Sequence, residues 1–206
     1  PRITLAVLQA TLDDLGALLR EAPDQHVHIN LSAHDLETED FMRELGRRVA
    51  ASGVPPSRLK LEITERSLIH SGKARALISA FRERGHRVAI DDFGTGYSSL
   101  AYLETFELDT LKIDKSFVDA IGTQAVTNNV IGHVIEMARS LELDTVAEGI
   151  ETRDQAQWLR DRGVDFGQGF LFSRPLTARR FRAFVRVRGG ARVHDLHRQR
   201  RPKTAS

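Results

Sequence analysis

The sequence predicts an α/β fold, a TIM-type (β/α) barrel, and three observations favour it. Short runs rich in Val, Ile, Leu and Phe alternate with helical patterns along the chain, which indicates parallel strands joined by right-handed crossovers. Nearly every predicted strand ends in a polar or charged residue, as expected where the carboxyl ends of barrel strands ring one mouth. A length of 206 residues, 41% of them hydrophobic, is enough for a sizeable single core.

A doubly wound open sheet is the competing architecture. It would concentrate its polar residues at one switch point and would usually show a glycine-rich first turn. Here the polar residues are spread over six strands, so the barrel is preferred. Six strands do not close a modified (β/α)8 barrel, and the chain is shorter than the roughly 250 residues typical of that fold. We therefore expect the N-terminal strand or strands to be absent from this chain.

The predicted strands are short and are bounded by turn or helix-end residues. In chain order they are His26–Ser32, Leu59–Glu65, Arg87–Phe93, Thr110–Asp114, Asp144–Ile150 and Phe166–Phe172.

Helical patterns fill the intervals between these strands. A leucine stripe that begins at Leu8 and ends at Leu19 predicts the first helix, and Leu77, Ile78 and Phe81 predict another. Thr152 and Gln155 form a capping-box pattern for a helix that ends near Gly163, and a last helix is expected after Thr177.

Composition and charge exclude several classes of protein. Cysteine is absent, which excludes disulfides and thiolate metal sites and favours a cytoplasmic location. No stretch approaches the roughly 18 apolar residues of a membrane span. Residues 179–206 carry nine Arg, one Lys and one Asp, so residues 1–178 are net acidic and no nucleic-acid partner is expected. We expect a barrel domain over residues 1–187 and a basic, disordered tail over 188–206.

The stretch DDFGTGYSSL is the most informative part of the sequence. Asp91 and Asp92 are adjacent, and neighbouring strand residues point to opposite faces, so both can serve one site only where the strand ends. Gly94 and Gly96 supply that end and let backbone N–H groups approach a ligand. Two close carboxylates repel each other unless a cation lies between them, which favours a divalent metal site. A capping aspartate followed by a turn is the alternative.

The other predicted strand ends carry further candidates, namely Asn30, Glu62, Glu65, Lys112, Glu148, Glu151, Gln168 and Gly169. Each has a plain structural alternative, such as a helix cap, a first-turn acid or a surface ion pair. Their joint placement at successive strand ends favours a metal site that hydrolyses a phosphodiester. His26 and His28 alternate on one strand, and we expect them to be packing or surface residues.

Six motifs, in this order and spacing, closely resemble the EAL domain family over about residues 5–187: INLSA, LEITE, DDFGTGYSSL, LKIDKSFV, VAEGIE and QGFLFSRP. The resemblance implies a bacterial phosphodiesterase that hydrolyses cyclic di-GMP to linear pGpG on a modified (β/α)8 barrel, with two Mg²⁺ or Mn²⁺ ions. It further implies a homodimer, and sensory, GGDEF or membrane-anchoring regions N-terminal to the domain in a longer parent protein, which could be anchored to the inner membrane.

The resemblance also implies a role for each matched residue. The metal ligands would be Asn30, Glu62, Asp91, Asp92 and Glu148, and the catalytic residues Lys112, Glu148 and Glu151. Gln168, Gly169 and Phe170 would bind substrate, and Glu65 would hold the DDFGTG loop.

One motif of the family is missing. The Glu-Ala-Leu sequence that gives the family its name is absent, and so is the arginine near it that contacts the substrate phosphate. The intact downstream positions favour a chain whose N-terminal part is not represented. A catalytically inactive cyclic di-GMP receptor is the alternative, and an unrelated Mg²⁺-dependent barrel enzyme is a third interpretation.

Overall fold

The structure is a computed structural model that describes residues 1–94, 103–123, 127–187 and 194–195. The second half of the DDFGTGYSSL stretch and most of the predicted tail lie outside these residues.

Within the described residues a seven-stranded sheet forms the centre of the molecule, with its strands in sequence order. Strands β1 to β6 pair in parallel, and β7 pairs antiparallel with β6. The strands are β1 (Val27–Leu31), β2 (Leu59–Thr64), β3 (Arg87–Phe93), β4 (Thr110–Ile113), β5 (Asp144–Ala147), β6 (Phe166–Gly167) and β7 (His194–Asp195). The predicted parallel α/β architecture is confirmed.

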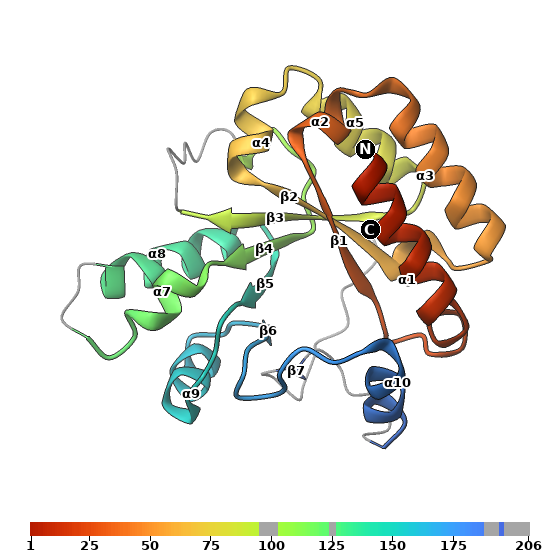
Figure 1. Ribbon diagram of the computed structural model, residues 1–206. Helices are drawn as coiled ribbons and strands as arrows, with labels where there is room; N and C mark the ends of the chain where they lie inside the picture. Colours follow the sequence, from red (N-terminus) through yellow and green to blue (C-terminus); the bar gives the residue numbers. More distant parts are fainter. Residues whose placement is uncertain (95–102, 124–126, 188–193, 196–206) are drawn as a thin grey trace.

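Helices flank this sheet, and Figure 1 shows α1, α3 and α5 beside β1 to β3 and α7 to α9 beside β4 to β6. The helices are α1 (Arg2–Glu21), α2 (Ala33–Glu37), α3 (Glu39–Ser52), α4 (Glu65–His70), α5 (Ala74–Glu83), α7 (Lys115–Asp119), α8 (Thr127–Ser140), α9 (Arg153–Asp161) and α10 (Ala178–Val187), with a short 3₁₀ helix at Pro56–Arg58. Among the described residues, none of the helices combines the length and the apolar character that crossing a lipid bilayer requires.

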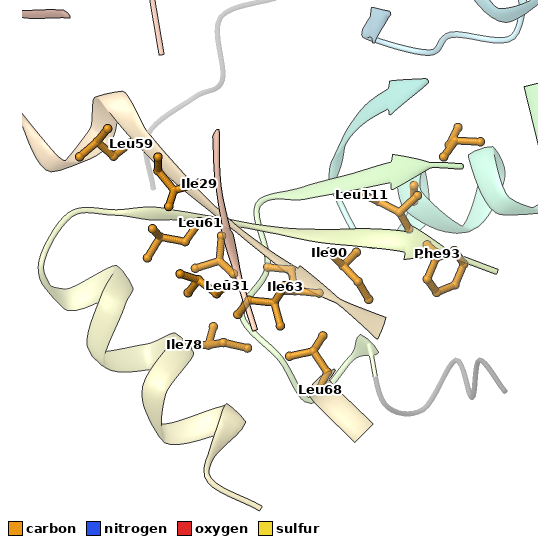
Figure 2. Packing of buried hydrophobic residues seen from close by; sticks show 14 of the residues in the cluster. Ile29, Leu31, Leu59, Leu61, Ile63, Leu68, Ile78, Ile90, Phe93 and Leu111 are labelled. Atoms are coloured by element: carbon orange, nitrogen blue, oxygen red, sulfur yellow. The ribbon is translucent and has the colours of Figure 1, made fainter. Parts of the chain in front are cut away.

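The two faces of the sheet differ in chemistry because alternate side chains of a strand point to opposite faces. One face is apolar and packs under the helices (Figure 2), with Leu61, Ile63, Ile90 and Leu111 almost fully buried. The other face carries polar side chains that are also buried, such as Lys60, which is 4% exposed. A polar inner face of this kind needs internal partners for its charges.

Most of the predicted strands extend past the observed ends, and two of them do so by at least three residues. The strand expected over Asp144–Ile150 ends at Ala147, and the one expected over Phe166–Phe172 ends at Gly167. The second ends early because the chain turns at Gly169, where Leu171 N donates to Ile150 O and Phe172 N donates to Gly169 O. A polar residue still follows each shortened strand directly: Glu148 comes after β5 and Gln168 after β6.

The structure also places two residues of the predicted tail. His194–Asp195 pair with Phe166–Gly167 as an antiparallel strand at the edge of the sheet. At these two residues the chain therefore differs from the expected disordered tail.

Candidate functional site

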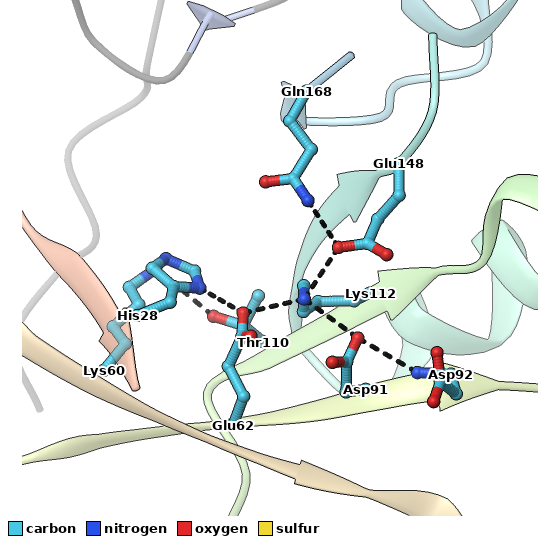
Figure 3. A network of polar contacts seen from close by, with 9 residues as sticks. All are labelled: His28, Lys60, Glu62, Asp91, Asp92, Thr110, Lys112, Glu148 and Gln168. Atoms are coloured by element: carbon cyan, nitrogen blue, oxygen red, sulfur yellow. Dashed lines mark hydrogen bonds and ion pairs between the residues drawn. The ribbon is translucent and has the colours of Figure 1, made fainter. Parts of the chain in front are cut away.

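The ammonium group of Lys112 lies at the centre of a cluster of carboxylates. Its Nζ is 2.8 Å from Glu62 Oε1, 2.9 Å from Asp91 Oδ1 and 2.7 Å from Glu148 Oε1. Figure 3 shows the three carboxylates converging on this lysine from separate strands. The Lys112 side chain is only 6% exposed, so the ion pairs are shielded from bulk water.

The parallel sheet explains why these residues meet. Glu62 lies near the end of β2, Asp91 near the end of β3 and Lys112 near the end of β4, and Glu148 follows β5 directly. Carboxyl ends of neighbouring parallel strands meet at one edge of the sheet. The predicted convergence of Glu62, Asp91, Lys112 and Glu148 is what the structure shows.

The cluster holds more negative than positive charge. Burial alone would lower the pKa of Lys112, but the charges of Glu62 and Glu148 and hydrogen bonds to Asp91 and Glu148 raise it well above the usual range. The lysine therefore stays charged, and its three carboxylate neighbours outnumber the one ammonium group. Added positive charge at this place would be stabilised.

The two glutamates of the cluster differ in acidity. Burial opposes ionisation of Glu62, yet a hydrogen bond and charge from His28, together with Lys112, lower its pKa below the usual range. Burial raises the pKa of Glu148, and the negative charges of Asp91 and Glu62 add to this effect against the opposing lysine. Glu148 is therefore the better proton acceptor of the two glutamates near neutral pH.

Asp91 and Asp92 are presented by an irregularity in β3. The pairing of β3 with β4 shifts register between Ile90 and Phe93, and Asp92 takes a left-handed backbone with φ of +54°. Burial and the negative charges of Asp91 and Asp114 raise the pKa of Asp92. The strand ends at Phe93, as predicted, and the register shift inside it leaves Asp92 exposed beside the buried Asp91.

Glu65 connects α4 to the start of the loop that follows β3. Its Oε2 accepts a hydrogen bond from Gly94 N at 3.1 Å, and the residue is 6% exposed. A Cβ on Gly94 would lie 2.6 Å from the ring of Phe117. The loop is thus fixed at its first residue by a carboxylate on one side and an aromatic ring on the other.

The segment after β6 adds a further contact to the cluster. Gln168 Nε2 donates to Glu148 Oε1 (Figure 3). Gly169 lies against the backbone of Ile150, and the exposed ring of Phe170 lies 5.2 Å from the guanidinium carbon of Arg174.

Asn30 and Glu151, which were also predicted as site residues, stay outside the Lys112 cluster. Asn30 is exposed at the end of β1, where it pairs in register with Glu62. Glu151 is half exposed, and its Oε1 lies 2.9 Å from Lys115 Nζ. Glu151 thus belongs to a separate ion pair with Lys115.

His28 is the residue that the sequence interpretation missed. Its Nδ1 contacts Glu62 Oε1, and its ring stacks on that of His26 with centroids 5.2 Å apart. The expectation of a mere packing or surface residue is therefore wrong for His28. The signal was available, because His28 and Asn30 are two residues apart and share one face of a strand.

The donor set fits a hard divalent cation in its chemistry. Carboxylate oxygens of Glu62, Asp91, Asp92 and Glu148 and the amide oxygen of Asn30 are the ligands that Mg²⁺ and Mn²⁺ prefer. In the described part of the chain, no three acidic or histidine side chains are arranged around an ion-sized point, because the three carboxylates point at Lys112 Nζ.

Comparisons with known proteins identify a family and several relatives that this chain resembles. A family model described as EAL domain matches residues 1–175. "Probable cyclic di-GMP phosphodiesterase PdeB" of Escherichia coli (strain K12) is 45% identical over 179 residues, which are 87% of this chain and 34% of the relative. The chain thus spans about a third of the length of that protein.

Solved structures agree with the sequence comparison. The cAMP and cyclic-di-GMP bound form of the EAL enzyme Bd1971 is 32% identical with a TM-score of 0.85, over 89% of this chain and 51% of that one. A manganese and cyclic di-GMP complex of Klebsiella pneumoniae BlrP1 is also 32% identical, with a TM-score of 0.77 over 86% of this chain and 45% of that one.

Proposed function

This chain belongs to the EAL domain family, and we propose that it hydrolyses cyclic di-GMP to linear pGpG with two divalent cations, Mg²⁺ or Mn²⁺. The observation that carries the proposal is the convergence of Glu62, Asp91 and Glu148 on Lys112 at the carboxyl ends of the strands. The relatives' names and the bound cyclic di-GMP in similar structures supply the substrate.

Five side chains would hold the cations. Asn30, Glu62 and Asp91 would bind one ion, and Asp91, Asp92 and Glu148 the other. Such ions, when bound, lower the pKa of water toward neutrality and offset the charge of a phosphodiester. The excess negative charge around Lys112 supports this assignment, because an acidic mouth needs cations before it can accept an anionic substrate.

Lys112 and Glu148 would carry out the proton chemistry. Lys112 Nζ orients the attacking water, and Glu148, with its raised pKa, accepts the proton that the water loses. The water oxygen forms a bond to phosphorus while the bond from phosphorus to the leaving O3′ breaks, and the O3′ oxyanion takes up a proton from solvent. Glu151, held by Lys115, would complete the charged rim of the site.

The remaining predicted residues would position substrate and loop. The exposed ring of Phe170 can stack on a guanine base. Gln168 supplies a polar amide beside Glu148, and Gly169, which has no side chain, leaves room there. Glu65 would hold the loop through Gly94. A homodimer in the cytoplasm and a barrel domain over residues 1–187 complete the proposal.

The test is a cleavage assay with cyclic di-GMP, Mn²⁺ and chromatographic detection of pGpG. We expect product from the wild-type chain, none after EDTA, and a loss of about 10²–10³-fold or more in Glu62→Gln and Asp91→Asn. Glu83→Gln is the matched control, since Glu83 is an exposed carboxylate in α5, before the amino end of β3. Tight binding of cyclic di-GMP without product would identify the chain as a receptor. Wild-type turnover in both site variants would contradict the residue assignment.

A further inference from the structure

His28 lies on the inner face of β1, next to the cluster of carboxylates around Lys112. Its Nδ1 contacts Glu62 Oε1 across the β1–β2 pair (Figure 3). The His28 side chain is 19% exposed and that of Glu62 only 3%, so little water competes for this contact. In the register of the two strands Asn30 pairs with Glu62, and His28 is therefore the diagonal neighbour of Glu62.

Two donors reach the same oxygen of Glu62. Lys112 Nζ is 2.8 Å from Oε1, and His28 Nδ1 contacts that oxygen from the other side of the carboxylate (Figure 3). An ionised carboxylate accepts only, so both nitrogens donate to it. Two donors on one oxygen fix the orientation of the carboxylate group, and both contacts leave Oε2 aside.

His26 supports His28 from behind. The two imidazole rings stack at an interplanar angle of 30° with centroids 5.2 Å apart. The stack restricts rotation of the His28 ring and so keeps Nδ1 directed at Glu62.

We propose that His28 is a positioning residue of the metal site: its Nδ1–H holds Oε1 of Glu62 and thereby presents Oε2 to the cation. The proposal rests on the proposed function, in which Glu62 is a metal ligand. Metal-ligating carboxylates are themselves held by hydrogen bonds, and loss of such a bond typically weakens metal affinity by about 10–100-fold.

The first test measures Mn²⁺ affinity by titration calorimetry on the full chain without substrate. We expect His28→Ala to bind Mn²⁺ about 10–100-fold more weakly than the wild type. His28→Asn should recover most of this loss, since its amide nitrogen occupies the δ position and can donate to Glu62. His34→Ala is the matched control, because it removes an exposed imidazole in α2, the helix that follows β1.

The outcomes separate this inference from the proposed function. Unchanged Mn²⁺ affinity in His28→Ala, with a wild-type chain that binds the ion, overturns the inference alone. A wild-type chain that binds no Mn²⁺ overturns the cation chemistry and, with it, the cation role of Glu62. A Mn²⁺ affinity of His28→Asn as weak as that of His28→Ala would also overturn the hydrogen-bond explanation.

A second test needs no metal and does not depend on the folding of a His28 variant. Long-range ¹H–¹⁵N correlation spectra of the wild-type chain report which ring nitrogen of His28 carries a proton. We expect a protonated Nδ1 whose signal shifts in Glu62→Ala. An unprotonated Nδ1 would overturn the proposal, because such a nitrogen cannot donate to a carboxylate.

Discussion

Lys112 is the residue on which the electrostatics of the site depend. It faces three carboxylates from three other parts of the sheet, and it is almost completely buried. A lysine in this position stabilises the fold as well as the site, because without it the carboxylates would repel one another.

Replacing Lys112 by Met tests this dual role. We expect Lys112→Met to lower the free energy of unfolding at pH 7 by about 3 kcal/mol, since removal of one partner leaves buried charges without compensation. The loss should shrink near pH 4, because Glu148, whose pKa is raised, then carries less negative charge. Urea denaturation at the two pH values measures both effects.

Lys115→Met is the matched control for this substitution. Lys115 also contacts two carboxylates, Asp119 and Glu151, but it is 46% exposed. Ion pairs in water contribute little to stability, so the control should unfold near the wild-type midpoint. Equal effects of the two variants would show that the Lys112 cluster has no special energetic role.

His26 makes the stability of the folded protein depend on pH. Burial, followed by the positive charges of Lys60, His28 and Arg87, lowers the pKa of His26 from 6.5 to about 3. The unfolded chain takes up this proton below pH 6.5 while the folded chain does not, so the stability that His26 contributes is complete above pH 6.5. It is lost as the pH falls toward 3, at up to about 1.4 kcal/mol per pH unit.

His26→Phe should remove that dependence and keep a ring on the same strand. We expect the variant to gain stability relative to the wild type on going from pH 7 to pH 4, in denaturation curves recorded at both values. Other groups that respond to acid, such as Asp35 and His86, are common to both chains and cancel in the difference. A difference that does not change with pH would refute the assignment.

At the scale of the element, the carboxyl ends of strands are where the sequence was most informative. Polar residues such as Asp91 and Glu148 follow apolar runs, and parallel pairing then forces them together. The capping box at Thr152 and Gln155 was predicted and is present. Such local patterns determine where elements begin, end and expose their polar groups.

The sequence did not predict contacts between elements that depend on side-chain reach. The link from His28 to Glu62 depends on register and ring orientation, and neither is visible in one strand taken alone. The early end of the strand at Gly167 depends on how closely Gly169 approaches Ile150. Hydrophobic patterns give the period of an element but not the close approach of two backbones.

Gly169 and Gly46 form a pair for testing that close approach. A Cβ on Gly169 would lie 2.2 Å from Ile150 O and 2.3 Å from Ile150 N, so Gly169→Ala must displace backbone. We expect a loss of about 2–3 kcal/mol in the free energy of unfolding. Gly46, inside α3, has nothing within 4 Å of its would-be Cβ, and Gly46→Ala should gain about 0.5–1 kcal/mol.

The two glycine variants have opposite expected signs in the same thermal denaturation experiment. A neutral Gly169→Ala would show that the segment after β6 can move away from Ile150 at little cost. The site should respond as well, because Gly169 follows Gln168, which contacts Glu148.

At the scale of the whole molecule, the sheet divides the protein into two environments. The outer face is a conventional apolar core under helices, whereas the inner face buries charged and polar groups such as Lys60, Glu62 and Thr110. An interior of this kind is stable only if its polar groups have internal hydrogen-bond or ion-pair partners. The barrel architecture therefore joins stability and function in the same set of side chains.

The position of Lys112 among its carboxylates has a consequence for how the protein matures. The chain carries an internal counterion, so folding can run to completion before any metal arrives. Proteins whose ligands repel without metal unfold when a chelator removes it. Treatment with EDTA should therefore leave the wild-type chain folded, with a cooperative thermal transition that differential scanning fluorimetry can show. The chain would fold first and bind cations afterwards, and Lys112→Met would weaken the fold of the metal-free chain.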